Sequence, residues 1–254
     1  MKFPALIVYL ILVIVSVKFG VIITRHDKAD EEYIELAKRL PVTSAVIKYN
    51  STDVAGTLIT QQWILSAAHV AEYIKEDQKL VWGEDSLIVE KVVLHPGWLE
   101  NGRPEDIALV KLKTPVADST PVKIYRDRDE KGREVFIVGN GDYGTGISGP
   151  AGNDGKFRAG TNIIDRVTDD YLIWEFEDPR EKPDKVTLLE GISGPGDSSG
   201  PAFIKNDSTY YLAGISSGQS TDATGGKEGL YGVTEYYTRV STYVNWIEQT
   251  ISTE

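Results

Sequence analysis

The 254-residue sequence contains no cysteine, a single methionine and only three histidines. Without cysteine the protein can form no disulfide, no thiolate metal site and no cysteine nucleophile. Its folded structure must therefore rest on a hydrophobic core alone, which a chain of this length is large enough to build. Any chemistry that needs an imidazole must use His26, His69 or His95.

Basic residues are also scarce, with 27 against 38 acidic residues and a formal net charge of −11. Residues 1–25 hold three of the basic residues and no acid, so the remainder carries 24 minus 38, a net charge of −14. A surface of this sign repels nucleic acid, so we expect protein or peptide partners and no nucleic acid. Most of the charge is expected to serve solubility.

A long apolar run lies at the N-terminus. Lys2 followed by apolar residues from Pro4 to Val17 is typical of a secretory signal. Continued to Thr24, the run spans about 20 residues and could cross a membrane. Small residues at the usual cleavage spacing are missing, so a cleaved signal peptide and a retained membrane anchor both stay open. We assign residues 1–25 to this segment and expect residues 26–254 to be extracytoplasmic, whether secreted, periplasmic or membrane-anchored.

Beyond Pro41, short β-rich runs alternate with turn residues. Before them, the charged stretch 26–39 has near-helical apolar spacing that indicates a short helix. The glycine-rich stretch 139–155 indicates a mobile surface loop, and the apolar residues within 243–251 predict a terminal helix. This order predicts a β-barrel or β-sandwich with a helix at its end. The expected strands are 44–49, 56–66, 79–82, 87–94, 107–112, 134–138, 163–167, 171–176, 202–204, 210–215 and 237–240.

The hexapeptide from Gly196 to Pro201 has the composition that an accessible nucleophile needs. Ser198 lies among residues with little side-chain bulk, just before an apolar strand. A serine attacks a carbonyl only when a base takes its proton, and the developing oxyanion needs fixed hydrogen-bond donors. We assign this oxyanion hole to the backbone N–H groups of Gly196 and Ser198.

His69 is the candidate base, because it ends an apolar run that closes in small residues and leaves room for a substrate. His26 and His95 lie in a charged segment and a turn, where solvated side chains are expected. Asp106 opens an apolar strand, and a charge that enters a core strand needs a partner. It could orient His69, although for Asp106 alone a turn-capping carboxylate is the better interpretation.

Together these segments resemble the chymotrypsin/trypsin family of serine proteases. The family's Ala-Ala-His, Asp-Ile-Ala-Leu and Gly-Asp-Ser-Gly-Gly-Pro signatures match, in the same order, residues 67–69, 106–109 and 196–201. The resemblance implies an all-β fold of two packed antiparallel β-barrels with a C-terminal helix. The first barrel would supply His69 and Asp106, and the second would supply Ser198.

The resemblance further implies a monomeric serine endopeptidase that works through an acyl-enzyme and needs no cofactor or metal. The competing interpretation is a catalytically silent homologue that acts as an extracytoplasmic binding module.

The resemblance also assigns four substrate-binding residues. Ser217 matches the serine that holds the catalytic aspartate, and Gly218 follows it on a strand that would pair with extended substrate. Ile192, six residues before Ser198, takes the place of the pocket-floor acid, so a trypsin-like preference for arginine or lysine is not indicated. Glu235 falls where many members have a pocket-wall glycine, and would narrow the pocket or attract a basic residue. A solvated surface glutamate is the other interpretation of Glu235.

The sequence departs from the family pattern in two further features, Ser199 and the activation site. Ser199 replaces a glycine, and a positive φ there would strain it; we expect activity to be modulated, not abolished. Family members usually free an apolar N-terminus that pairs with the aspartate before the nucleophile, here Asp197, but no basic residue followed by Ile-Val-Gly-Gly is present. Our hypothesis is that removal of the export segment near Gly20 exposes Val21 or Ile22 for this pairing.

Overall fold

A computed structural model describes residues 22–101 and 105–254. The expected signal peptide or anchor lies almost entirely outside the described residues. Within the described ranges, no helix is long and apolar enough to cross a membrane. Ile22, Ile23 and Thr24 are buried, so the folded part begins ahead of the boundary at residue 26 that the sequence indicated.

Six strands from the first half of the chain form a closed barrel in the order β2-β3-β4-β7-β6-β5. Their inward side chains are mostly valine, isoleucine and leucine, which pack well on a pleated surface. Strands β4 and β7 pair with Ser66 opposite Ala108, so the end of one and the start of the other lie at the same rim. The strands are β2 (Val46–Lys48), β3 (Val54–Leu58), β4 (Trp63–Ser66), β5 (Lys79–Trp82), β6 (Asp85–Leu94) and β7 (Ala108–Leu112).

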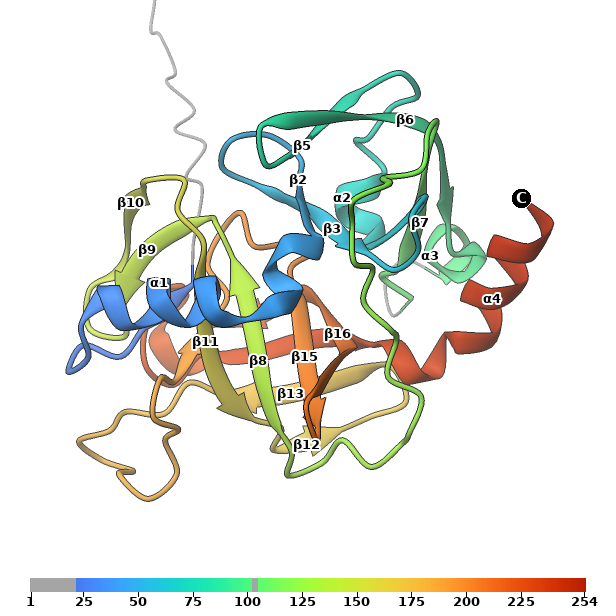
Figure 1. The fold of residues 1–254 in the computed structure, drawn as a ribbon. Helices are drawn as coiled ribbons and strands as arrows, with labels where there is room; N and C mark the ends of the chain where they lie inside the picture. The colour runs from blue at the N-terminus through green and yellow to red at the C-terminus, as the bar shows by residue number, and fades with distance from the viewer. Residues whose placement is uncertain (1–21, 102–104) are drawn as a thin grey trace, which may run out of the picture.

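The second half of the chain forms a seven-stranded sheet in the order β11-β8-β15-β16-β17-β13-β12, which lies below the first barrel in Figure 1. Its hydrogen-bonded ladder is open, but Asn162 of β11 donates a side-chain hydrogen bond to the carbonyl of Glu175 at the end of β13. The strands are β8 (Glu134–Gly139), β11 (Arg158–Ile163), β12 (Arg166–Val167), β13 (Tyr171–Glu175), β15 (Pro201–Asn206), β16 (Thr209–Ser220) and β17 (Thr234–Arg239).

A smaller sheet, in the order β10-β9-β1-β14, flanks this second half. Its strands are β1 (Ile23–Thr24), β9 (Asp142–Thr145), β10 (Gly149–Asn153) and β14 (Gly191–Ile192). The expectation of a mobile loop over 139–155 is wrong, because this stretch contains the β9–β10 hairpin. A Cβ on Gly144 would lie 2.1 Å from the carbonyl oxygen of Gly149. The glycines therefore allow a close strand approach that composition alone does not reveal.

The helices are short and lie at the edges of the sheets: α1 (Asp30–Arg39), α2 (Ala68–Ala71), α3 (Pro96–Asn101) and α4 (Val244–Thr253), with 3₁₀ turns at Pro41–Ala45, Asp222–Thr224 and Val240–Thr242. Helix α1 lies across β11 (Figure 1). Arg158 of β11 is 1% exposed and forms ion pairs with Asp30 and Asp154, which fixes α1 to the second half.

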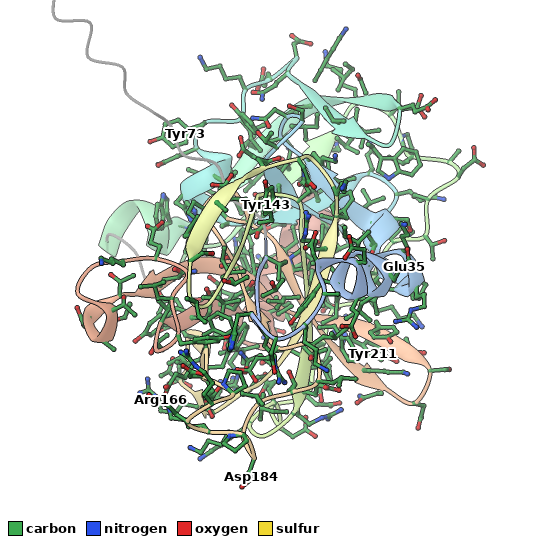
Figure 2. All side chains as sticks on the ribbon, turned by 90° about the vertical axis from the view of Figure 1, so that its left-hand side faces the viewer. Glu35, Tyr73, Tyr143, Arg166, Asp184 and Tyr211 are labelled. Carbon is green, nitrogen blue, oxygen red and sulfur yellow. The ribbon has the colours of Figure 1, made fainter. Side chains whose placement is uncertain are left out.

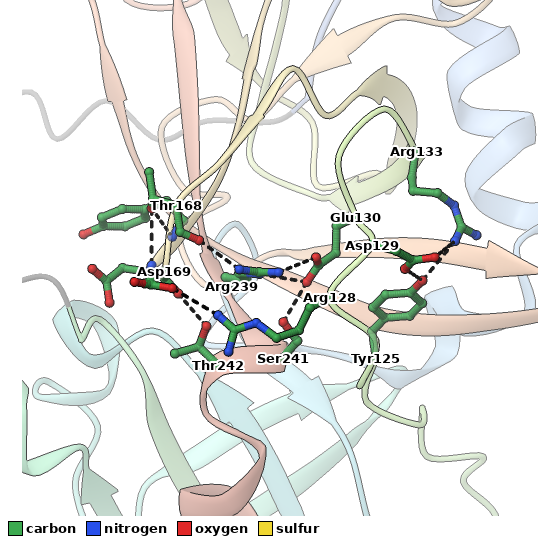
Figure 3. Close-up of polar contacts among 12 residues, drawn as sticks. Tyr125, Arg128, Asp129, Glu130, Arg133, Thr168, Asp169, Arg239, Ser241 and Thr242 are labelled. Atoms are coloured by element: carbon green, nitrogen blue, oxygen red, sulfur yellow. Dashed lines mark hydrogen bonds and ion pairs between the residues drawn. The ribbon is translucent and has the colours of Figure 1, made fainter.

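A buried ion pair attaches the connector between the halves to the end of β17 (Figure 3). Arg239 donates to both carboxylate oxygens of Glu130, at 2.9 and 2.6 Å, and the Ser241 hydroxyl donates at 2.6 Å. Burial alone would raise the pKa of Glu130, but the hydrogen bonds from Arg239 and Ser241 outweigh it and hold that pKa below its usual value.

Together, the strands and α4 confirm the all-β fold with a C-terminal helix.

Candidate active site

His69 and Asp106 meet at the rim of the first barrel. His69 follows β4 in the one-turn helix α2, and Asp106 stands two residues before β7. The carboxylate accepts from the backbone N–H of His69 at 2.9 Å and lies 2.7 Å from its Nδ1. Two contacts from one carboxylate fix both the position and the orientation of the imidazole. Nε2, on the other side of the ring, makes no contact with Asp106 and can exchange a proton with a neighbouring group.

The second half of the molecule holds Asp106 from the other side. Ser217 of β16 donates to its Oδ2 at 2.6 Å, and Thr238 of β17 donates to its backbone carbonyl at 2.9 Å. Asp106 is 2% exposed, so the hydrogen bonds from Ser217 and from the His69 N–H replace the water that its carboxylate has lost. Ser217 bridges the two halves.

Ser198 and His69 line one cavity, although no hydrogen bond joins their side chains among the described residues. Such contacts are often long without substrate. Gly196 has φ of 95°, which favours glycine, and its carbonyl accepts from Val54 of the first barrel. Within the described ranges, the N–H groups of Gly196 and Ser198 make no hydrogen bond. Both are therefore available to an oxyanion.

Asp197 is buried and directly precedes Ser198. Its oxygens accept the backbone N–H groups of Gly141 and Gly194, both at 3.1 Å. Burial nevertheless raises the pKa of Asp197 to about 7. No cation pairs with this carboxylate among the residues described. Ile22 is buried and contacts Gly191, whereas Val21 lies outside the described residues.

Ser199 adopts the backbone conformation that the sequence comparison suggested, with φ of 69°. Its hydroxyl accepts the backbone N–H of Ala67 at 2.9 Å and lies 3.1 Å from the hydroxyl of Ser66. Ser66 and Ala67 belong to the segment that leads to His69. The Ser199 side chain therefore links the loop that carries Ser198 to the segment that leads to His69.

Ser198 borders two cavities. The larger, about 430 Å³, lies on the His69 side and has aromatic walls from Tyr49 and Tyr73; Tyr73, labelled in Figure 2, is 66% exposed. The smaller, about 190 Å³, lies on the other side of Ser198. Its lining residues are Ser193, Gly194, Pro195, Ser198, Ser216, Gly218, Gln219, Thr221 and Glu228.

Glu235 lies behind this smaller cavity and is fully buried, so it is not the solvated surface residue that we considered. The Ser193 hydroxyl donates to its carboxyl, and so does the side-chain amide of Gln219. Burial raises the pKa of Glu235 to about 8. Of the other expected binding residues, Gly218 lines the cavity. Ile192 does not, because its pairing with Ile23 directs it into the core.

Sequence reasoning missed Gln219 and Ser193, and it misjudged His95. A hydrophobic pattern carries no signal for a polar side chain that turns back into a pocket, which is why Gln219 and Ser193 were overlooked. His95 is only partly exposed: its ring packs edge-on against Tyr243 and Trp246, and burial lowers its pKa. His26 lies 2.7 Å from the Tyr231 hydroxyl, away from the cavities beside Ser198.

The fold and the site define a two-part β protein with a histidine–aspartate pair facing a serine. The family model for trypsin matches residues 39–171, which is 133 of 254 residues. The chain belongs to the trypsin family of serine proteases.

Three relatives show how far the likeness extends. Complement C1s subcomponent of Sus scrofa is 28% identical over 232 residues, which cover 77% of this chain but 32% of that protein. This chain thus spans about a third of that relative. Cationic trypsin-3 of Rattus norvegicus is 28% identical over 218 residues, covering 78% of this chain and 79% of the relative. Venom peptide isomerase heavy chain of Agelenopsis aperta is 27% identical over 236 residues, covering 76% of this chain and 86% of the relative.

Proposed function

We propose that this chain is a serine endopeptidase in which Ser198, His69 and Asp106 form a catalytic triad. The observation that carries the proposal is the double contact of Asp106 with His69, on the cavity that Ser198 also lines. One relative is named an isomerase, so family membership alone does not fix the reaction. The proposal therefore rests on the arrangement of these three side chains.

The mechanism is acyl transfer. Ser198 Oγ attacks the peptide carbonyl carbon while its proton passes to His69 Nε2, and the N–H groups of Gly196 and Ser198 bind the oxyanion. The C–N bond then breaks, and His69 gives the proton to the leaving amine. Water hydrolyses the acyl-enzyme by the same steps, with His69 again as base. Asp106 keeps the proton on Nδ1, so that Nε2 is the basic nitrogen, and no cofactor or metal takes part.

The test is covalent labelling by a fluorophosphonate serine probe. We expect wild type to be labelled, Ser198→Ala to be unlabelled, and the exposed control Ser252→Ala to behave as wild type. If correctly folded and processed wild type stays unlabelled, the protein is a silent homologue that binds peptides without cleaving them.

We also propose that a chain beginning at Val21 or Ile22 places its amino group beside Asp197. The buried carboxylate without a described cation partner supports this. N-terminal sequencing of active protein is the test, and a start before Val21 or well after Ile23 would contradict it. The apolar N-terminal run supports an extracytoplasmic location, and we propose that the enzyme is a monomer. Fractionation of the producing cells and gel filtration test location and monomeric state.

A further inference from the structure

The two cavities beside Ser198 must receive opposite sides of a scissile bond, if the proposed function holds. His69 protonates the leaving amine, so the residues after the bond lie on the His69 side. This assigns the larger cavity to the leaving group. The smaller cavity, on the other side of Ser198, then takes the side chain of the residue that becomes acylated onto the enzyme.

Gln219 determines which polar groups a substrate side chain can contact in this smaller cavity. Its amide nitrogen donates to the Ser193 carbonyl at 2.6 Å and to the Glu235 carboxyl, so the side chain spans the cavity's base. Ser193 and Gln219 line the cavity, whereas Glu235 does not. Gln219 therefore lies between the buried carboxyl and any substrate.

The cavity that remains is nearly neutral. Its volume of about 190 Å³ is enough for one side chain, since a dry cavity of about 150 Å³ binds benzene. With a raised pKa, the buried carboxyl is largely protonated at neutral pH. Glu228 contributes a carboxylate at the rim, but it is exposed, where screening weakens its attraction for a cation.

We infer that Gln219 is the specificity-determining residue of this enzyme, and that it restricts the residue before the scissile bond to uncharged side chains such as alanine, serine or threonine. Arginine and lysine are rejected because Gln219 lies in front of Glu235 and its amide nitrogen already donates to that carboxyl.

Kinetics on peptide substrates that differ only in the residue before the scissile bond provide the first test. For wild type we expect kcat/KM with alanine or serine to exceed that with arginine or lysine by at least about tenfold. Gln219→Gly should raise kcat/KM for arginine by at least about tenfold, because it opens a path to Glu235. Adding Glu235→Gln should remove that gain, while the exposed control Gln61→Gly should keep the wild-type profile.

Peptide binding to the Ser198→Ala protein provides a second readout that needs no catalysis. We expect calorimetry to show tighter binding of peptides that end in alanine than of peptides that end in arginine, with this order reversed by Gln219→Gly. Absent labelling and hydrolysis together with this binding order would remove the proposed function and leave the role of Gln219 intact. A wild-type preference for arginine or lysine, in kinetics or binding, would overturn the inference, as would an unchanged preference in correctly folded Gln219→Gly.

Discussion

The two halves of the molecule bury very different side chains. Among the described residues, the first half contributes one buried charged side chain, Asp106, to a barrel filled with aliphatic residues. The second half and its connector bury eight: Glu130, Asp142, Arg158, Glu177, Glu190, Asp197, Glu235 and Arg239. The first half is therefore held mainly by apolar packing, whereas the second depends on how its buried charges are paired or protonated.

Because of this difference, the two halves contribute different properties to the site. The apolar barrel provides a frame that holds His69 against Asp106. The second half holds Ser198, the smaller cavity and two buried carboxyl groups with raised pKa values, Asp197 and Glu235. Changes at these carboxyl groups should therefore alter how stability depends on pH.

The largest effect is expected on kcat, from a change at Asp106 in the first half. Asp106→Asn keeps the size of the side chain but lets His69 adopt the wrong tautomer. We expect kcat to fall by about 10⁴-fold, a magnitude taken from the equivalent aspartate of related proteases. Steady-state kinetics measure it, with exposed Asp118→Asn as control. A loss below about tenfold would show that Asp106 does not orient the base.

The next largest effect concerns a buried ion pair of the second half. Glu130→Ala leaves the Arg239 guanidinium buried and without its carboxylate (Figure 3). We expect the free energy of unfolding to fall by about 3–5 kcal/mol, measured by urea denaturation against exposed Glu84→Ala. If both variants unfold at the same urea concentration, the ion pair contributes nothing to holding the connector.

The same contrast explains which parts could be predicted from the sequence. Short apolar, β-rich runs mark the strands of the first barrel at 79–82 and 107–112, but the run 56–66, which was expected to be one strand, is divided between β3 and β4. The β9–β10 hairpin was missed because its glycines permit a backbone approach and leave no side-chain pattern. Gln219 and Ser193 were missed because their roles depend on three-dimensional hydrogen bonds to Glu235. His69, Asp106 and Ser198 could be named because they stand in short segments with distinctive neighbours.

A smaller effect should appear in how stability depends on pH. Burial raises the folded-state pKa of Glu235 to about 8, above its ordinary value. The folded state then binds the proton more tightly than the unfolded state, so this contribution is fully present below about pH 4.5 and is lost as pH rises through 8. Glu190, whose pKa burial likewise raises to about 8, acts in the same direction.

We therefore expect the unfolding free energy of wild type to decrease between pH 5 and pH 8.5. Glu235→Gln should flatten this decrease by an amount on the order of a few kcal/mol, because the neutral amide cannot titrate. Urea denaturation at several pH values measures the slope, with Glu84→Gln as control. An identical slope in Glu235→Gln would mean that its carboxyl titrates normally in the folded protein.

The smallest effect is expected at Ser199, where the two halves are joined by a strained residue. A positive φ in a residue with a Cβ costs about 1–2 kcal/mol, while each hydrogen bond of the hydroxyl contributes about 0.5–1.5 kcal/mol. Ser199→Ala keeps the strain and leaves the Ala67 N–H unpaired, so it should destabilise by about 1–3 kcal/mol. Ser199→Gly loses the same hydrogen bonds but relieves the strain. It should therefore cost less than about 1 kcal/mol.

Urea denaturation of the two variants separates strain from hydrogen bonding, because both lose the hydroxyl and only glycine relaxes the backbone. Ser252→Ala, exposed in α4, should stay within about 0.5 kcal/mol of wild type. Both Ser199 variants should also lower kcat more than they raise KM, since the lost hydrogen bond aligns Ser198 with the segment before His69. Equal destabilisation by alanine and glycine would mean that Ser199 is unstrained. The two halves would then meet at the nucleophile without stored strain.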